Sequence, residues 1–595
     1  MPSRDHALPR KLAGLLTGAF LFFATGGFVL WQNTHLTVLW DLSYILENAS
    51  RISLGQRPYR DFPFPYAPLS FLLQAAIIKL FGRVVVYHYL YAAVTAGFAS
   101  LLTWRILLRL LAASRLPARI VAFLLSVPLI FLGTSSILPN PFYDSDCTLF
   151  IVFCAWLLLR VESAGFPRLP TFVCGTLLVV PLFIKQNTGL AFLLSAAVCI
   201  AWLGIRNRRA AFLLLGGAAT GLVFALALIQ WTVGLANYLH WTIQFAASRR
   251  LPGFTTMLGV YTDSALLWIY FVFALGITLF LRRGKVLRVP LSEIRWLAAT
   301  LLALPFLWAV AALFLKEDPS DRVEALLHLW PVLLTSSLAL ALWEFLRSGP
   351  KTIAQLLPFI LLGSVHGAFL SQQIWGSTYA LWPLLMILLA TILIALTRRE
   401  PALNSVDRGA NNVATDSIEG SKPGRYALPL TAFSALASLA LLVTGAYYAL
   451  SHERLDYVDL SGETLAHSSL PALRGLAMRG EWLPDFEELV AYSEREIPRT
   501  DGILMLPGED LFYFTTGRTP QFPVVLLDNT VNPYSAAQIS QLARHRNVRW
   551  LVVKRTLQLQ EEPLSFRPQL LDLLSHDFEA AESLNNYDIY RRKQN

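Results

Sequence analysis

Charge is scarce in this chain of 595 residues. Only 15% of the residues are charged, whereas 55% are hydrophobic, and the mean hydropathy is +0.51. A soluble globular domain ordinarily has about 25% charged residues. The shortage of charge excludes water as the main solvent of the chain and indicates an integral membrane protein.

Cysteine is also rare, and the charge that is present forms no patch. All four cysteines lie in apolar runs, which predicts small core residues and excludes a disulfide framework or a cysteine metal cluster. The net charge is +10, but Lys and Arg are spread between the hydrophobic runs without interleaved aromatics. This distribution excludes a nucleic-acid partner. The cysteines are Cys147, Cys154, Cys174 and Cys199.

Long apolar runs are abundant. A membrane-spanning helix needs about 20 apolar residues, because each unpaired backbone group in hydrocarbon costs several kcal/mol. Roughly thirteen runs meet this need, which predicts a polytopic α-helical membrane protein. The predicted spans are 12–31, 84–108, 120–137, 142–159, 169–184, 188–205, 210–233, 265–281, 296–315, 329–346, 353–370, 381–396 and 427–450.

The apolar segment 68–82 is short for a span and carries Gln74 and Lys79, so we predict a helix on the membrane surface. With the N-terminus in the cytoplasm, the loops place 24 Lys and Arg inside and 10 outside, leaving 15 in the tail. Cytoplasmic loops carry the excess of Lys and Arg, and this bias would reverse if 68–82 crossed the membrane. The tail is therefore expected outside.

The chain is predicted to contain two parts. Residues 1–450 form the transmembrane domain, with a large outer loop at 32–83 and a flexible cytoplasmic linker at 397–426. Residues 451–595 form a small α/β domain on the periplasmic side, because short apolar runs alternate with helical stretches there. The apolar runs are 502–506, 522–527 and 548–553, and 535–544 is a helical stretch.

Acidic residues gather at the predicted outer face. Asp144 and Asp146 fall in the first turn of a span, where they either complement the helix macrodipole or line an outer cavity. Asp41 either caps the helix that begins at Leu42 or acts as a carboxylate held by a loop that proline and aromatic residues stiffen.

Several stretches resemble the GT-C glycosyltransferases, particularly the protein O-mannosyltransferase and aminoarabinose transferase group of family 39 type. The stretch "WDLSYILENASRISLGQRPYRDFPFPYAPLSFLLQ" is similar to the first outer loop of that group. The stretches "NPFYDSDCTLFIVFCAWLL" and "FIKQNTGL" resemble its second acidic motif and its basic motif, and thirteen spans precede an outer α/β domain in both. The resemblance covers nearly the whole chain.

The chain departs from this family at two places. The paired acidic residues after the first span appear here as Asp41 followed by Leu42, and the Lys-Pro-Pro-Leu element appears as Tyr66-Ala67-Pro68-Leu69. The missing lysine removes one expected phosphate contact. The fold alone does not fix the donor or the acceptor.

The resemblance implies transfer of a sugar from a polyprenyl-phosphate carrier to a lipid, glycan or protein acceptor. It implies Asp41 as the general base, with Asp144 or Asp146 orienting acceptor or sugar. Lys185, beside Gln186, is expected to bind the leaving phosphate; the alternative is a lysine that reaches the headgroups. Further substrate-binding residues expected from this likeness, or from their place on outer loops, are Tyr44, Asp61, Arg249, Arg250 and Arg322.

Other functions fit some of these observations. Many spans with intramembrane charges also describe a transporter or lipid flippase, and an O-antigen ligase or polymerase would share donor and face. No metal spacing is secure, so no obligatory metal is expected, although some relatives in the family bind a divalent cation at this face. The single Asn48-Ala49-Ser50 sequon lies inside the outer loop, which favours a bacterial inner membrane.

Overall fold

The computed structural model describes most of the chain. The described residues are 4–35, 37, 39–136, 138–250, 259–282, 290–348, 352–370, 380–397, 427–450, 463–529, 531–558 and 564–593. The predicted linker 397–426 lies outside them except for Thr397, as does the predicted domain boundary at 451.

Each predicted span is helical over most of its length, as hydrocarbon requires of a backbone that must satisfy its own hydrogen bonds. Among the described residues, eight helices are long and apolar enough to cross a membrane. The count of thirteen spans stays a prediction. The helices are α1 (Arg4–Asn33), α4 (Val85–Ala112), α5 (Ala118–Ser126), α6 (Leu129–Leu132), α7 (Tyr143–Ser163), α8 (Arg168–Leu177), η1 (Val180–Phe183), α9 (Gln186–Leu203), α10 (Arg208–Thr232), α14 (Leu267–Leu281), α15 (Leu291–Leu315), α17 (Leu329–Ser348), α18 (Ile353–Phe369), α19 (Trp382–Thr397) and α20 (Ala427–Leu450).

Two of the predicted spans are not single helices. The segment predicted at 120–137 is divided into α5 and α6 around Pro128, and the segment at 169–184 is divided into α8 and the short 3-10 helix η1, which contains Pro181. Proline has no backbone N–H to donate and its ring clashes with the preceding turn. The hydropathy of these runs predicts membrane burial but does not show the breaks.

Shorter helices connect the long ones. The predicted surface segment is helix α3, which has 13 residues and spans about 20 Å, less than the hydrocarbon thickness of about 30 Å. The connecting helices are α2 (Leu39–Ser53), α3 (Leu69–Phe81), α11 (Leu235–Leu239), the π-helix η2 (His240–Phe245), α12 (Ala246–Arg250), η3 (Ser264–Leu266) and α16 (Pro319–Leu327).

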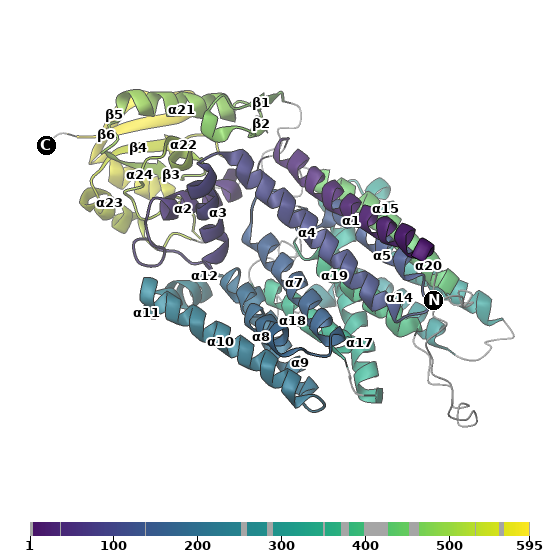
Figure 1. The fold of residues 1–595 in the computed structure, drawn as a ribbon. Helices are drawn as coiled ribbons and strands as arrows, with labels where there is room; N and C mark the ends of the chain where they lie inside the picture. The colour runs from purple at the N-terminus through teal and green to yellow at the C-terminus, as the bar shows by residue number, and fades with distance from the viewer. Residues whose placement is uncertain are drawn as a thin grey trace.

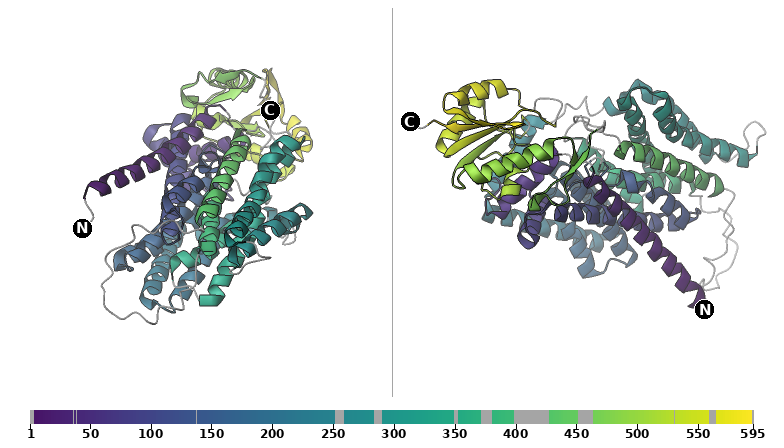
Figure 2. Two further views of the ribbon diagram at one scale, coloured as in Figure 1. Left: turned by 90° about the vertical axis from the view of Figure 1, so that its right-hand side faces the viewer. Right: turned by 90° about the horizontal axis from the view of Figure 1, so that it is seen from above.

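Close helix packing in the transmembrane part uses glycine. Helices α8 and α10 contact each other, as do α1 and α4, and α9 and α18. A Cβ atom on Gly217 would lie 2.2 Å from the carbonyl oxygen of Phe172, and one on Gly175 would lie 2.1 Å from that of Leu214. Small residues let helix backbones approach closely in a membrane. Figure 2 shows the resulting bundle from two further directions.

The C-terminal part is a small α/β domain. Its four-stranded sheet has the order β3-β4-β6-β5, in which β3 and β4 are parallel and the other neighbours are antiparallel. Strands β1 and β2 form a separate antiparallel pair. The elements are β1 (Leu465–His467), η5 (Pro471–Leu473), β2 (Ala477–Arg479), α21 (Trp482–Glu496), β3 (Gly502–Leu506), α22 (Phe512–Thr516), α23 (Ala536–His545), β4 (Val548–Lys554), α24 (Arg567–Ser575), β5 (Phe578–Ser583) and β6 (Tyr587–Arg592).

The apolar runs 502–506 and 548–553 are strands, as their composition predicts, but 522–527 is irregular. Pro523 cannot donate a strand hydrogen bond, and Leu527 instead donates its N–H to the carbonyl oxygen of Pro507 at 2.7 Å. Phe522 and Leu527 are apolar because they lie in the domain core. Figure 1 shows α2 and α3 between this domain and the other helices.

Gly217→Ala is expected to lower the yield of folded protein in detergent and its thermal stability. The new methyl group would clash with the backbone of Phe172, which can move only if helix α8 moves with it. Such overpacking typically costs about 1–3 kcal/mol. Gly216→Ala is the matched control, since a Cβ there meets nothing within 4 Å. Equal stability of the two variants would contradict the close α8–α10 packing.

Candidate active site

An ion pair lies where two long helices begin. Asp144 is in the first turn of α7, and Lys185 immediately precedes α9. The Lys185 Nζ contacts Asp144 Oδ1, and both side chains are buried, with exposed fractions of 7% and 4%. Removing one partner of a buried pair leaves an uncompensated charge, at a cost of about 3–5 kcal/mol. The pair therefore holds each side chain in place.

Asp146, two residues further along, is engaged on both oxygens. Ser70 Oγ donates to Asp146 Oδ2 at 2.6 Å, and Tyr91 Oη donates to Oδ1 at 2.8 Å. Ser70 belongs to α3 and Tyr91 to α4. Asp146 thus ties the start of α7 to α3 and α4, whereas Asp144 faces Lys185.

The residue after Lys185 attaches this region to the segment between α2 and α3. Gln186 Nε2 donates to the Pro65 carbonyl oxygen at 2.9 Å, and Gln186 Oε1 accepts from the Ala67 N–H at 3.1 Å. Two opposed bonds to one short stretch fix that backbone in register. The segment that departs from the family's Lys-Pro-Pro-Leu element is therefore held directly against the start of α9.

Asp41 lies in the first turn of α2 and is half-buried. Residues three apart on a helix share a face, so Asp41 and Tyr44 are neighbours on α2. The ring of Tyr44 lies 5.0 Å from that of Tyr66, and Tyr66 lies 5.2 Å from Tyr143. Lys185 Nζ lies 5.8 Å from the centre of the Tyr143 ring. A row of aromatic rings thus joins the Asp41 face of α2 to the ion pair.

The turn that follows α2 contains Asp61, which is exposed. Its Oδ2 accepts the Arg57 N–H at 2.7 Å, which closes the turn. Tyr59 in this turn is buried and adopts a positive φ of 66°, a conformation rare for a bulky residue. Its hydroxyl donates to the Tyr66 carbonyl oxygen at 2.6 Å. The turn therefore braces Tyr66, and Asp61 lies on its solvent side.

The predicted arginines belong to two other helices, α16 and α12. Arg322 in α16 donates to the carbonyl oxygen of Lys316 at 2.8 Å and to Tyr447 Oη at 3.2 Å, so it braces its own loop. Arg249 and Arg250 end α12, and their side chains lie outside the described residues.

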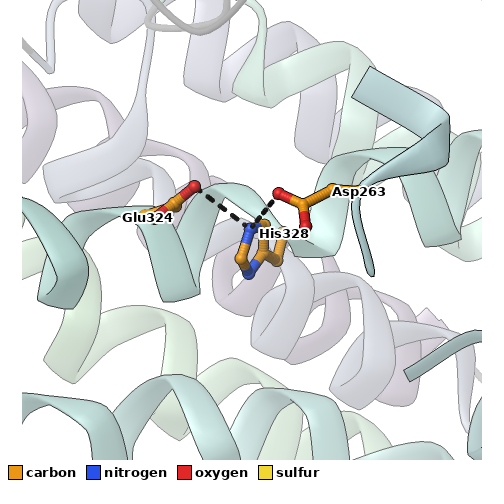
Figure 3. Close-up of side chains that lie close together, drawn as sticks. All are labelled: Asp263, Glu324 and His328. Carbon is orange, nitrogen blue, oxygen red and sulfur yellow. Dashed lines mark ion pairs between the residues drawn. The ribbon is translucent and has the colours of Figure 1, made fainter. Parts of the chain in front are cut away.

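A second polar group lies beside Arg322. His328 Nε2 is 3.8 Å from Asp263 Oδ2 and 3.5 Å from Glu324 Oε1, and both carboxylates point at the ring in Figure 3. These three residues could hold a metal ion, since their ligand atoms lie within 4.8 Å of one another. Imidazole with two carboxylates is a donor set that suits Zn²⁺ or Mn²⁺.

The C-terminal domain also contacts α2. Glu47 of α2 is buried, and its carboxylate oxygens accept the backbone N–H groups of Tyr513 and Phe514 at 2.9–3.2 Å. Burial raises the pKa of Glu47 to about 8, and the two N–H donors limit the rise. Arg51 of the same helix donates to the Pro523 carbonyl oxygen at 2.7 Å.

A cavity of about 400 Å³ lies elsewhere, between the ends of α4, α7, α17, α18 and α19. Arg109 and Glu162 line it, and Glu162 is about 27 Å along α7 from Asp144 at the usual rise per residue. The cavity is therefore at the opposite end of α7 from the ion pair, and none of the predicted site residues lines it.

Sequence reasoning missed the residues that complete this site. Ser70, Tyr91 and Tyr143 are ordinary helix or loop residues in the sequence, and their partners are far along the chain. The same holds for Asp263, which lies 65 residues before His328. Only their predicted position at the same membrane face connects them.

No protein-family model matches the chain, and no curated protein matches it. Among solved structures, ArnT from Cupriavidus metallidurans bound to undecaprenyl phosphate has 10% identity and a TM-score of 0.40, covering 98% of both chains. The arabinofuranosyltransferase AftD from Mycobacteria has 14% identity and a TM-score of 0.39, covering 97% of this chain and 40% of that chain.

A third similar structure is the archaeal oligosaccharyltransferase AglB from Archaeoglobus fulgidus, in complex with an inhibitory peptide and a dolichol-phosphate. It has 12% identity and a TM-score of 0.43, covering 92% of this chain and 70% of that chain. All three are GT-C glycosyltransferases, the group that the sequence motifs resemble. Because each TM-score is below 0.5, the function is inferred below from the residues of this chain.

The contact between Glu47 and the C-terminal domain is expected to weaken as the pH rises from about 4.5 to about 8. The packed state keeps a proton that the separated carboxyl releases above its ordinary pKa of 4.5, so the packed state binds more protons in this window. Above about 8 the loss is complete. The charged or titratable groups acting on Glu47 are Arg51, Arg83, Asp510 and Tyr513.

The measurement is urea unfolding of the purified protein at pH 6 and pH 9, in wild type and Glu47→Gln. The glutamine keeps an oxygen acceptor for both N–H groups but does not titrate, so it should lose less stability at the higher pH. Identical pH profiles for the two proteins would show that Glu47 does not carry the effect.

Proposed function

We propose that this chain is a glycosyltransferase that takes a sugar from a polyprenyl-phosphate carrier and transfers it to a lipid, glycan or protein acceptor. The supporting observation is the buried pair of Asp144 and Lys185, joined through aromatic rings to the helix that bears Asp41. A cation at the start of a helix favours an anion, and a lipid phosphate reaches such a place from the bilayer.

Asp41 is the proposed general base. As the acceptor oxygen forms its bond to the anomeric carbon, its proton passes to the Asp41 carboxylate, and the bond from that carbon to the phosphate oxygen breaks. The electron pair of the broken bond stays with the polyprenyl phosphate. Displacement from the opposite face inverts the anomeric centre, and the sugar has oxocarbenium character at the transition state.

Lys185 is the proposed partner of the leaving phosphate. Negative charge grows on that phosphate at the transition state, and a fixed cation in a site that excludes water stabilises it strongly. Asp144 holds the ammonium group in place before the donor binds. Asp146, with both oxygens engaged by Ser70 and Tyr91, is assigned to positioning the start of α7.

The proposed orientation follows the charge bias of the loops. The N-terminus lies in the cytoplasm, and the C-terminal domain lies on the periplasmic side of a bacterial inner membrane. The carboxylates then lie at the outer ends of their helices. A transporter or flippase would instead be expected to bind its substrate near the midplane.

Asp41→Asn is expected to lower sugar transfer by about 10²–10⁴-fold, the usual contribution of a general base. The measurement is transfer of radiolabelled sugar from a panel of polyprenyl-phosphate sugars in membranes with matched expression. Lys185→Met should also abolish transfer, and Lys185→Arg should retain part of it because the charge is kept. Asp321→Asn is the control, since Asp321 forms a solvent-exposed ion pair with Lys316, and such pairs contribute little to stability.

Full transfer by Asp41→Asn would remove Asp41 from the role of base. If the wild type transfers no sugar from any donor but moves labelled lipid across vesicles, the chain is a flippase and the proposal is wrong.

Chelation with EDTA is expected to leave at least half of the transfer activity, because Lys185 supplies the charge that the leaving phosphate needs. The residues that would hold a divalent cation are Asp263, Glu324 and His328. Loss of activity on chelation, restored by Mn²⁺ and reproduced by Glu324→Gln, would instead make the metal obligatory.

A further inference from the structure

The start of α2 is bonded by a side chain from the C-terminal domain. The first N–H groups of a helix have no partner within the helix, and the Leu39 N–H is one of these. It donates to Gln558 Oε1 at 2.8 Å, and Gln558 Nε2 donates to the Thr37 carbonyl oxygen at 3.0 Å. One amide group thus bonds the backbone at residues 37 and 39, and the second of these is two residues before Asp41.

Gln558 is itself held by buried charges. Its N–H donates to Glu509 Oε1 at 3.1 Å, and that oxygen is 2.6 Å from Lys554 Nζ. Lys554 is also 2.7 Å from Asp510, which accepts the Trp482 indole N–H at 2.8 Å. The three charged side chains are almost completely inaccessible to solvent. Each buried charge needs the others, so these charges hold Gln558, which lies in the loop after β4, to the end of that strand.

The other end of α2 is bonded to the same domain. Glu47 accepts two N–H groups from the start of α22, and Arg51 donates to Pro523. The helix between Leu39 and Arg51 is about 18 Å long. A rigid rod bonded at both ends can neither slide nor rotate, so the direction of the Asp41 side chain is set by the C-terminal domain.

We infer that the C-terminal domain is a positioning element of the active site, in which Gln558 fixes the backbone that carries Asp41. This inference rests on the proposed function, in which Asp41 is the base. Gln558 is a positioning residue and touches no reacting atom. The domain therefore does more than cover the outer loop, because its removal from α2 misplaces a reacting group.

The test compares the full chain as wild type, Gln558→Ala and Gln541→Ala. Gln541 is an exposed glutamine on α23 of the same domain, so its variant is the matched control. Transfer from a polyprenyl-phosphate sugar is measured over a range of donor and acceptor concentrations. We expect kcat of Gln558→Ala to fall by roughly ten- to a hundredfold, because a base misplaced by about 1 Å costs that much. The donor KM should stay within about twofold of wild type, since Lys185 is untouched.

A second measurement is hydrogen–deuterium exchange of the same proteins. In Gln558→Ala the amides of residues 39–46 should exchange faster, while those of β3 and β4 keep wild-type protection. An unchanged kcat together with unchanged exchange of α2 would overturn the inference. Faster exchange throughout the domain would also overturn it, because Gln558 would then stabilise the domain rather than position α2.

A further variant removes only one of the two hydrogen bonds of the Gln558 side chain. Gln558→Glu keeps an oxygen for the Leu39 N–H but faces the Thr37 carbonyl oxygen without a donor, so its kcat should fall between wild type and Gln558→Ala. If α2 is released as expected but the wild type transfers no sugar, the proposed function fails and the mechanical coupling of the domain to α2 stands.

Discussion

Backbone hydrogen bonding in hydrocarbon determines where this protein can hold a reactive group. Helices satisfy their own N–H and C=O groups, so the apolar runs form helices, and irregular backbone is confined to their ends. The ends also leave unpaired N–H groups with a partial positive charge. Asp144, Asp146 and Lys185 all lie at such ends. The proposed site residues therefore lie where helices begin and where backbone N–H groups can bind polar side chains.

The same physical rule explains why the site is assembled from distant segments. A buried carboxylate is tolerated only with donors around it, and α7 alone cannot provide them. Asp144 forms an ion pair with Lys185 at the start of α9, and Asp146 accepts hydrogen bonds from hydroxyl groups on α3 and α4. These polar contacts fix the relative positions of four helices whose apolar surfaces would otherwise pack in several registers.

The apolar runs of the sequence predicted most of the fold. The thirteen predicted segments are helical, and Gly502–Leu506 and Val548–Lys554 are strands, because burial alone determines those patterns. The apolar pattern was misleading at 522–527, where an apolar run lies in the domain core without forming a strand. It also did not show that Pro128 and Pro181, which have no backbone N–H, divide two of the helical runs. Hydropathy measures burial and does not record backbone hydrogen bonding.

The site was less predictable than the fold for a related reason. Acidic residues near a membrane face stand out because they are costly there, so Asp144 and Asp146 are visible in the sequence. Their partners are not, since Ser70 and Tyr91 are common in any helix. The role of Glu47 is hidden in the same way, because its donors are backbone N–H groups more than 460 residues away.

A loop that carries the proposed base must also be stiff, and proline and aromatic residues supply only part of that stiffness. They restrict the turn after α2, where Tyr59 and Phe64 pack, but they do not fix the rotation of α2 itself. The rotation of α2 is limited by the side chain of Gln558, which bonds the backbone at the start of the helix, and by the two N–H groups that Glu47 accepts. Gln558 and both N–H groups belong to the C-terminal domain. The order of the segments in the sequence thus conceals these contacts, because residues 513 and 558 bond a helix that begins at Leu39.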